Sequence, residues 1–168
     1  MPYFVAIGIV WAYLTKRDLR SLLSMRFKYP YLILSALVFQ ILFNTMPIGH
    51  SGLMTVLYVL SFGCIVIGLM MNWNKPGFKL ILVGSMLNLL VILANDGTMP
   101  VYLGTAHLLH LSQGSDYLAT HHFIDSNAWD WWLSDWLPLP LFIMSPGDIF
   151  VGIGVIQLVL LNGKRQRE

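Results

Sequence analysis

Charged residues are scarce in this chain. They make up 11% of its 168 residues, whereas apolar residues make up 57%. A soluble domain carries about 25% charged residues, so too few are present to cover a soluble surface of this size, and we expect lipid to surround much of the protein. Cysteine is nearly absent as well. The one cysteine, Cys64, lies inside an apolar run, which excludes a disulfide framework and predicts a small packing residue.

Five apolar segments are present, and each is a candidate for a membrane helix, which needs about 17–25 residues. They cover residues 2–14, 31–46, 53–71, 78–94 and 146–161. The first is short, but no small-residue cleavage site follows it, so we expect a retained helix that spans the membrane partly or with little tilt. The predicted fold class is all-α: a polytopic bundle of about five transmembrane helices that forms one domain over residues 1–168.

Basic residues are missing from two of the four connections between these segments. All ten lie at residues 16–28, at residues 75–79 and in the tail after residue 163. The positive-inside rule places these three stretches in the cytoplasm. The connections at 44–52 and 96–145 contain no Lys or Arg. With five helices, the N-terminus is expected outside the membrane and the C-terminus inside, in the cytoplasm.

The connection at 96–145 is too polar to span a membrane. It contains five aspartates, four histidines and a run of four tryptophans: Asp96, Asp116, Asp125, Asp130, Asp135, His107, His110, His121, His122, Trp129, Trp131, Trp132 and Trp136. Tryptophan prefers the membrane–water interface, because its ring is apolar and its N–H is polar. We therefore predict an outer interfacial cap between the fourth and fifth helices.

A polar turn, residues 95–100, follows the fourth apolar segment. One interpretation is a helix C-cap, in which Asn95 and Gly97 tolerate a positive φ and a proline stops the helix. The other is that Asp96 faces a pocket at the membrane edge and takes part in catalysis. Asn88 lies two turns before Asn95 on the same helix face, and an Asn within a span requires a partner. Both asparagines are candidate binding residues under either interpretation.

The last apolar segment opens with Ser145-Pro146-Gly147-Asp148. The structural interpretation is a capping box, with Ser145 as the N-cap and Asp148 three residues later, near the positive end of the helix dipole. The functional interpretation is an ionisable group at the bilayer edge, where such groups are functional candidates. Ser145 and Asp148 are therefore candidate binding residues, and Asp148 is also a candidate catalytic residue.

The histidines do not show the spacing of a metal site. His107 and His110 are three residues apart, whereas His121 and His122 are adjacent and point to different sides of a regular element. A zinc site requires three or four converging ligands, and no His lies inside a predicted span to ligate a haem. We expect no metal and no cofactor, and His122 remains a candidate catalytic residue.

Several features follow one another along nearly the whole chain. They are a short first helix, a basic loop with leucines at 16–28, the turn at 95–100, His122, the stretch Asp135-Trp136-Leu137-Pro138-Leu139-Pro140 and the motif Ser145 to Asp148. In this order they resemble a bacterial family of uncharacterised polytopic membrane proteins, the domain of unknown function numbered five-three-one-seven. The turn of that family reads Asn-Gly-Gly-x-Met-Pro, so Asp96 stands in place of a Gly and inherits no role. The resemblance implies the fold and supplies no activity.

A more distant similarity is to lipoprotein signal peptidase, an aspartic membrane enzyme. Asp96 and Asp148 occupy places comparable with its two aspartates, and two carboxylates that share a proton can activate a water. The Asn-x-Ala-Asp motif of that family is Ser-Pro-Gly-Asp here, and its Gly-Asn-x-x-Asp-Arg motif is not reproduced around Asn88.

Three function classes remain. The first is a non-enzymatic protein that binds a ligand, or is an accessory or structural subunit of a membrane assembly. Its partners would be the lipid bilayer and other membrane subunits, with no nucleic acid. The second is a membrane-embedded hydrolase or peptidase that uses Asp148 with Asp96 or His122. The third is a small transporter, which the lack of an inverted repeat disfavours. Because capping explains both acidic motifs, the first class is favoured.

Overall fold

The computed structural model describes residues 2–18, 25–45, 52–109, 121–139, 142–162 and 164–165. Most of these residues are helical, as predicted. The helices are α1 (Pro2–Leu14), α3 (Pro30–Thr45), α4 (Gly52–Met71), α5 (Phe78–Ala94), α6 (Leu103–Leu108), α7 (Pro146–Asn162) and the 3-10 turn η2 (Trp131–Leu133). Each long helix begins and ends within one residue of the apolar segment in which it was expected.

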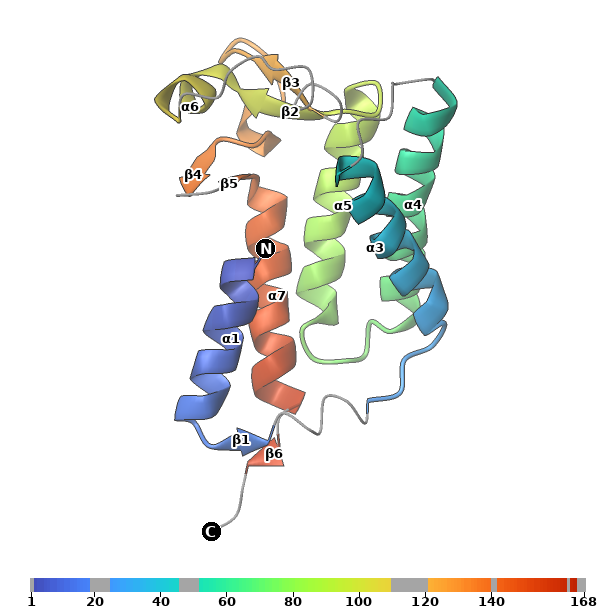
Figure 1. Ribbon diagram of the computed structural model, residues 1–168, viewed down its shortest axis with the longest axis vertical. Coiled ribbons are helices and arrows are strands. Elements are labelled where there is room, and N and C mark those ends of the chain that lie inside the picture. The colour runs from blue at the N-terminus through green and yellow to red at the C-terminus, as the bar shows by residue number, and fades with distance from the viewer. Residues whose placement is uncertain are drawn as a thin grey trace.

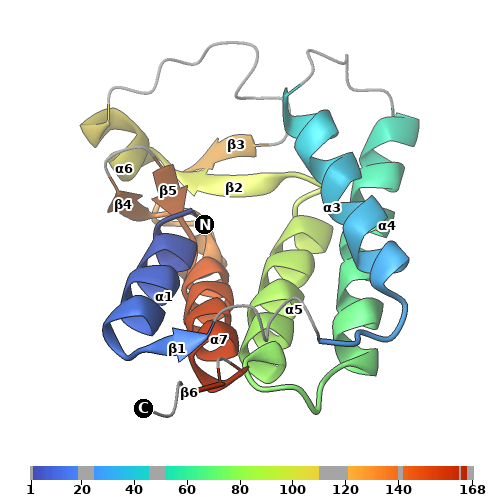
Figure 2. The same ribbon diagram turned by 60° about the horizontal axis from the view of Figure 1, so that its bottom comes forward.

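The five long helices pack in the order α1, α7, α5, α4 and α3, so that the first and last helices of the chain are neighbours. Figures 1 and 2 show this bundle, with α1 along the lower part of α7 and α3 lying against α4. At the interface of α1 and α7, the ring of Phe4 lies where a side chain on Gly152 would have to go.

Two pairs of glycines bring α5 and α7 together. A Cβ on Gly84 would overlap the carbonyl oxygen of Gly147, and a Cβ on Gly77 would overlap that of Gly154. The two pairs are seven residues apart in each segment, with Gly77 as the N-cap of α5, so the backbones touch at two levels. Small residues on one stripe are typical of helices that pack closely in lipid.

The apolar core forms two clusters between these helices. One consists of the buried residues Phe43, Tyr58, Val91, Ile92 and Met99, and the other of Ala36, Ile65, Leu69 and Phe78. Cys64 packs against the second cluster as a free thiol, which agrees with its predicted packing role.

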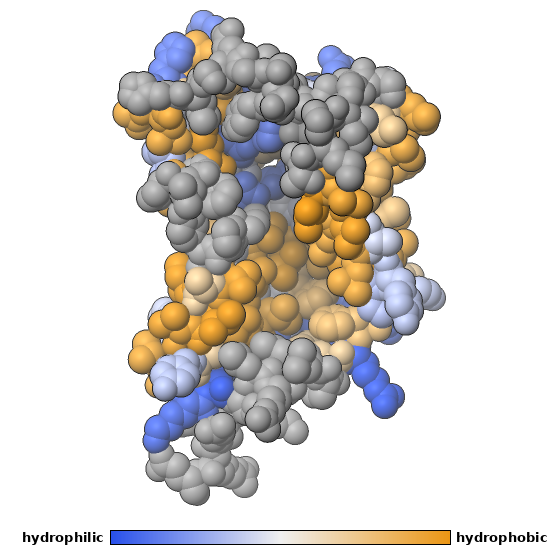
Figure 3. All heavy atoms as spheres, viewed as in Figure 1, coloured by the Kyte–Doolittle hydropathy of each residue, from blue (hydrophilic) through white to orange (hydrophobic). Residues whose placement is uncertain are grey.

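Among the residues that the structure describes, α4 is the one helix that is both long enough and apolar enough to cross a membrane. The apolar stretches in α1, α3, α5 and α7 are shorter, with 10–17 residues each. The expectation of five spans therefore has direct support at α4 alone. Figure 3 shows that apolar side chains nevertheless cover the middle of one face of the molecule, with hydrophilic residues toward its two ends.

Short strands correct the prediction of an all-α fold. At the upper end of the bundle in Figure 1, β2 (Met99–Tyr102) pairs in parallel with β3 (His121–Ile124), and β4 (Leu137–Leu139) pairs antiparallel with β5 (Phe142–Met144). The polarity of this segment indicated a surface location. The β2–β3 pairing joins residues 22 positions apart, which no local pattern predicts, whereas β4 and β5 form a local hairpin in a stretch whose prolines do not favour strands. These strands, with α6 and η2, form the cap.

The opposite end of the bundle carries basic residues. There β1 (Arg17–Asp18) pairs with β6 (Lys164–Arg165), which places two of the basic stretches side by side. The third stretch lies at the same end, in the turn between α4 and α5. The buried side-chain amide of Asn72 holds the segment before α3 against the end of α4. It accepts a hydrogen bond from the Lys28 N–H and donates to the carbonyl oxygens of Lys28 and Gly68.

Candidate functional site

The polar side chains of α5 and α7 meet where α7 begins. The Ser145 N–H donates to Asp148 Oδ2 at 3.2 Å, and the Asp148 N–H donates to Ser145 Oγ at 3.1 Å. These reciprocal bonds form the capping box that the spacing predicted. Asn88 completes the group, since its Nδ2 donates to Asp148 Oδ1 and its Oδ1 accepts from Ser145 Oγ, both at 3.0 Å. We call Asn88, Ser145 and Asp148 the helix-start cluster.

The hydrogens of the helix-start cluster can be assigned from its chemistry. An ionised carboxylate only accepts, so the Asn88 amide must present its nitrogen to Asp148 and its oxygen to Ser145. The Ser145 hydroxyl then accepts from the Asp148 backbone and donates to Asn88. All four hydrogen bonds have one donor and one acceptor, so the cost of placing an Asn within an apolar helix is offset.

Gly147 makes the contact between the two helices possible at this point. A Cβ at this position would overlap Asn88 Oδ1 and would lie 2.8 Å from the Gly84 carbonyl oxygen. The sequence shows a Gly in the first turn of a helix, where it lowers helix propensity. The structure supplies the reason, which is that the Asn88 amide lies directly against the α7 backbone.

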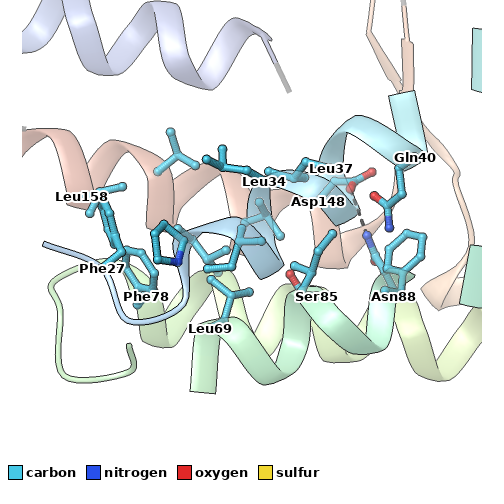
Figure 4. Close-up of a pocket in the computed structure, with 17 residues that line it drawn as sticks. Phe27, Leu34, Leu37, Gln40, Leu69, Phe78, Ser85, Asn88, Asp148 and Leu158 are labelled. Carbon is cyan, nitrogen blue, oxygen red and sulfur yellow. Dashed lines mark hydrogen bonds between the residues drawn. The ribbon is translucent and has the colours of Figure 1, made fainter. Parts of the chain in front are cut away.

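A cavity of about 610 Å³ extends from the helix-start cluster between α3 and α7. Its lining residues are Phe27, Pro30, Ile33, Leu34, Leu37, Gln40, Phe62, Ile65, Leu69, Phe78, Ile81, Ser85, Asn88, Asp148, Val151, Val155 and Leu158. In Figure 4 the side chains of Gln40, Asn88 and Asp148 converge at one end, and Phe27, Phe78 and Leu158 lie at the other. The cavity is therefore apolar along most of its length, with a polar end.

Gln40 and Ser85 also contribute to the polar end. Ser61 Oγ donates to the Tyr58 carbonyl oxygen, so it must accept the 3.2 Å hydrogen bond from Gln40 Nε2. This fixes the orientation of the Gln40 amide. Neither Gln40 Oε1 nor Ser85 Oγ has a hydrogen-bond partner among the residues that the structure describes.

A second polar network joins the end of α5 to the cap. Asn95 Nδ2 donates to Asp130 Oδ2 and, at 2.9 Å, to the Val91 carbonyl oxygen. Thr98 Oγ1 donates to the Asn95 carbonyl oxygen and lies 2.8 Å from His122 Nδ1, which therefore carries the proton of that contact. Burial lowers the pKa of His122, while the carboxylates of Asp130 and Asp96 oppose this effect, so the fold favours the neutral imidazole.

Asp135 was not among the predicted site residues. It is buried in the cap, where its N–H donates to the Pro100 carbonyl oxygen and its own carbonyl accepts from the Tyr102 N–H. Burial raises the pKa of its carboxyl group well above the usual range, and the charge of Asp148 adds to this effect. Its Oδ2 lies 3.8 Å from His121 Nε2, whereas Oδ1 has no hydrogen-bond partner among the residues that the structure describes. The burial of Asp135 could not be predicted from the local sequence Asp-x-x-Pro-x-Pro.

The predicted site residues therefore separate into two groups. Asn88, Ser145 and Asp148 come together in the helix-start cluster, whereas Asn95 and His122 belong to the cap network. Asp96 has φ 52° and an exposed side chain at the end of α5. It lies beyond Ala94, the last residue of α5, which is already roughly 9 Å from Asn88 along the helix axis, whereas Asp148 is hydrogen-bonded to Asn88 itself. This separation weighs against a shared proton between Asp96 and Asp148. His110 and Asp116 lie outside the described residues.

Comparison with known proteins places the chain in a family. The profile of a family of unknown function, DUF5317, matches residues 24–160. The chain belongs to this family. A protein of Thermotoga maritima, described as uncharacterized, is 35% identical over 118 residues, which cover 67% of this chain and 68% of the relative. No solved structure matches the chain.

The DUF5317 match includes every residue of the helix-start cluster, the cavity and the cap network, whereas α1 lies outside it. The left-handed backbone at Asp96 also gives a physical reason for the Gly that the resembled turn has there, because Gly adopts positive φ without strain. Asp is one of the few other residues that tolerate this region, so the substitution is compatible with the turn.

Proposed function

We propose that this DUF5317 protein is a polytopic membrane protein whose five long helices lie within the bilayer. Large apolar side chains are exposed on every one of them, including Val10, Leu34, Ile67, Leu90 and Ile153. Exposure of these apolar side chains to water is unfavourable, whereas lipid solvates them. The lengths of 16–20 residues in α3, α4, α5 and α7 are close to the roughly 20 needed for a span. With 13 residues, α1 spans part of the bilayer.

The cap lies outside and the basic end faces the cytoplasm under this proposal. Its support is that the basic stretches meet at one end of the bundle, as the positive-inside rule requires. At the other end the cap exposes Trp129 and Trp132, which suits a headgroup region. The N-terminus is then outside and the C-terminus in the cytoplasm of a bacterial plasma membrane.

Within that bilayer, the function that the geometry favours is non-enzymatic binding of an amphiphilic molecule. The single observation that carries this proposal is the cavity between α3 and α7, which is apolar along its length and polar at the helix-start cluster. Its volume falls within the roughly 300–1,000 Å³ of small-molecule sites. A ligand with an apolar chain and a polar head matches both parts. The proposal includes a role for the protein as an accessory or structural subunit of a larger membrane assembly.

Photolabelling in lipid nanodiscs tests the binding proposal. Lipids with a diazirine in the chain are offered with several headgroups, and the labelled residues are mapped by mass spectrometry. Leu37→Trp fills the cavity and should reduce labelling of its lining at least several-fold. Val38→Trp is the matched control, since Val38 neighbours Leu37 on α3, is exposed and is not a lining residue. Equal labelling in both variants, or no labelling of the lining by any probe, would rule out the binding proposal.

A hydrolase is the second candidate, and Asp135 is the observation that favours it. Burial and the charge of Asp148 raise the pKa of the Asp135 carboxyl group, as suits the acid of an aspartyl pair in which Asp148 is the base. Recovery of the bound probes separates the two functions. A binding protein returns them intact, whereas a hydrolase returns cleaved products that Asp135→Asn abolishes without loss of photolabelling.

A further inference from the structure

Two polar atoms at the end of the cavity have no partner in the described part of the chain. Gln40 Oε1 is turned away from Ser61, because the amide nitrogen makes the hydrogen bond to that hydroxyl. Ser85 is more than nine-tenths buried and lines the cavity, yet its hydroxyl group is unbonded. Both residues line the cavity, so these two atoms are available for hydrogen bonds to a molecule bound in it.

The charge of the polar end limits what that molecule is. None of the lining residues is Lys, Arg or His, so a phosphate or carboxylate headgroup would meet no countercharge and would face Asp148. A cation is not required either. The Asp148 carboxylate already accepts from Asn88 and from the Ser145 N–H, and it lies at the positive end of the α7 dipole. An uncharged head that can donate a hydrogen bond fits these conditions.

We propose that the cavity binds a lipid alcohol, meaning a molecule with a free, uncharged hydroxyl head on one or more long apolar chains. The hydroxyl donates to Gln40 Oε1 and accepts from Ser85 Oγ, beside Asp148. The chain lies along Leu37 and Ile81 toward Phe78, and enters from the side through the hollow that Figure 3 shows between α7 and α3. This inference rests on the proposed binding function and names the class of its ligand.

Matched photoprobes test the headgroup. Nanodiscs of phosphatidylcholine receive a diazirine-chain diacylglycerol, its phosphate ester (phosphatidic acid with the same chains), or a single-chain diazirine alcohol. The lining should be labelled at least about tenfold more by an alcohol than by the phosphate ester. A comparison of the two alcohols shows whether the source is a glycerolipid or a single-chain alcohol. Preference for either alcohol supports the proposal.

Variants connect the preference to the two unbonded atoms. Each hydrogen bond of about 1 kcal/mol corresponds to roughly a fivefold change in affinity. Gln40→Leu and Ser85→Ala should each reduce labelling by the alcohol about fivefold and leave labelling by the phosphate ester unchanged. Ser35→Leu and Ser35→Ala are the controls, because Ser35 lies on α3, is exposed and does not line the cavity.

The outcomes separate this inference from the function on which it rests. If the phosphate ester labels the lining as strongly as the alcohols, or if Gln40→Leu and Ser85→Ala change nothing, the lipid-alcohol assignment is overturned. The binding function survives in both cases, provided that Leu37→Trp still blocks labelling. If Leu37→Trp has no effect on any probe, the binding function itself fails.

Discussion

Asn88 and Asp148 are joined by a hydrogen bond, and their side chains can be exchanged in the double variant Asn88→Asp with Asp148→Asn. This exchange tests whether the stability of the helix-start cluster depends on its hydrogen bonds or on a negative charge at position 148. Asp148→Asn replaces one carboxylate oxygen with an NH2 group. Because that group is a donor, it opposes either Asn88 Nδ2 or the Ser145 N–H, both of which now donate to Asp148. Asn88→Asp alone places two carboxylates next to each other, so that one must take up a proton.

The double variant restores the hydrogen bond between positions 88 and 148, with the donor now at position 148 and the acceptor at position 88. The carboxylate now at position 88 accepts from the Ser145 hydroxyl and from the amide nitrogen at position 148, whose oxygen still accepts from the Ser145 N–H. Every hydrogen bond of the cluster again has one donor and one acceptor. The remaining loss is the interaction of a carboxylate with the α7 dipole, about 0.3–1 kcal/mol.

The expected magnitudes follow from this count. Asp148→Asn loses a hydrogen bond to a charged group, about 1.5–3 kcal/mol, and the dipole interaction as well. In a chain of this length, 1 kcal/mol lowers the unfolding temperature by about 2–4 °C. We expect each single variant to unfold roughly 5–15 °C below the wild type, and the double variant to recover to within a few degrees of it.

Thermal unfolding of the purified protein in nanodiscs, followed by tryptophan fluorescence, measures these differences. Asp125→Asn is the control for loss of one negative charge, because Asp125 is exposed and its contact with the Asn127 N–H needs only one side-chain oxygen. A double variant that is as unstable as the sum of the two single variants would refute the reasoning. The stability of the cluster would then require a carboxylate at position 148 itself.

Three further predictions follow from other parts of the structure. Gly147→Ala should destabilise the protein strongly, because its Cβ overlaps the Asn88 amide, whereas Gly63→Ala, with open space around its Cβ, should be neutral or stabilising when unfolding temperatures are compared. Asp135→Asn should raise stability at neutral pH. Because the pKa of Asp135 is raised in the folded protein, the wild type loses stability as the pH rises from the usual aspartate range toward that folded pKa. When the unfolding temperature is measured against pH, the variant should not show this decline. A reporter fused after Arg167 should be active in the cytoplasm, and periplasmic activity would overturn the proposed orientation.

The pH dependence of the cap has a second component of opposite sign. Burial lowers the pKa of His122, so the folded protein favours the neutral imidazole. Stability associated with His122 is fully present above the usual histidine pKa of about 6.5 and is lost as pH falls below it. Asp135→Asn leaves this acid-side loss in place, which allows the two contributions to be measured separately.

The sequence by itself determined what depends on neighbouring residues. The five apolar runs predicted the long helices because a helix needs only a continuous stretch of suitable side chains. The Ser145–Asp148 spacing predicted the capping box because both partners lie within one helical turn. The absence of basic residues from 96–145 and their presence elsewhere predicted the two ends of the bundle, since composition alone distinguishes them.

Only the tertiary structure decided which distant groups meet. Asn88 was expected to find a partner, but Ser145 and Asp148 lie 57 and 60 residues further along the chain, and their contact depends on glycines that allow α5 and α7 to touch. The burial of Asp135 and the β2–β3 pairing, whose partners are 22 residues apart, likewise arise from contacts without a local pattern. The cavity exists because α3 and α7, which are not consecutive, leave space between them, and the shape of that space is a property of the packed helices that no single segment encodes.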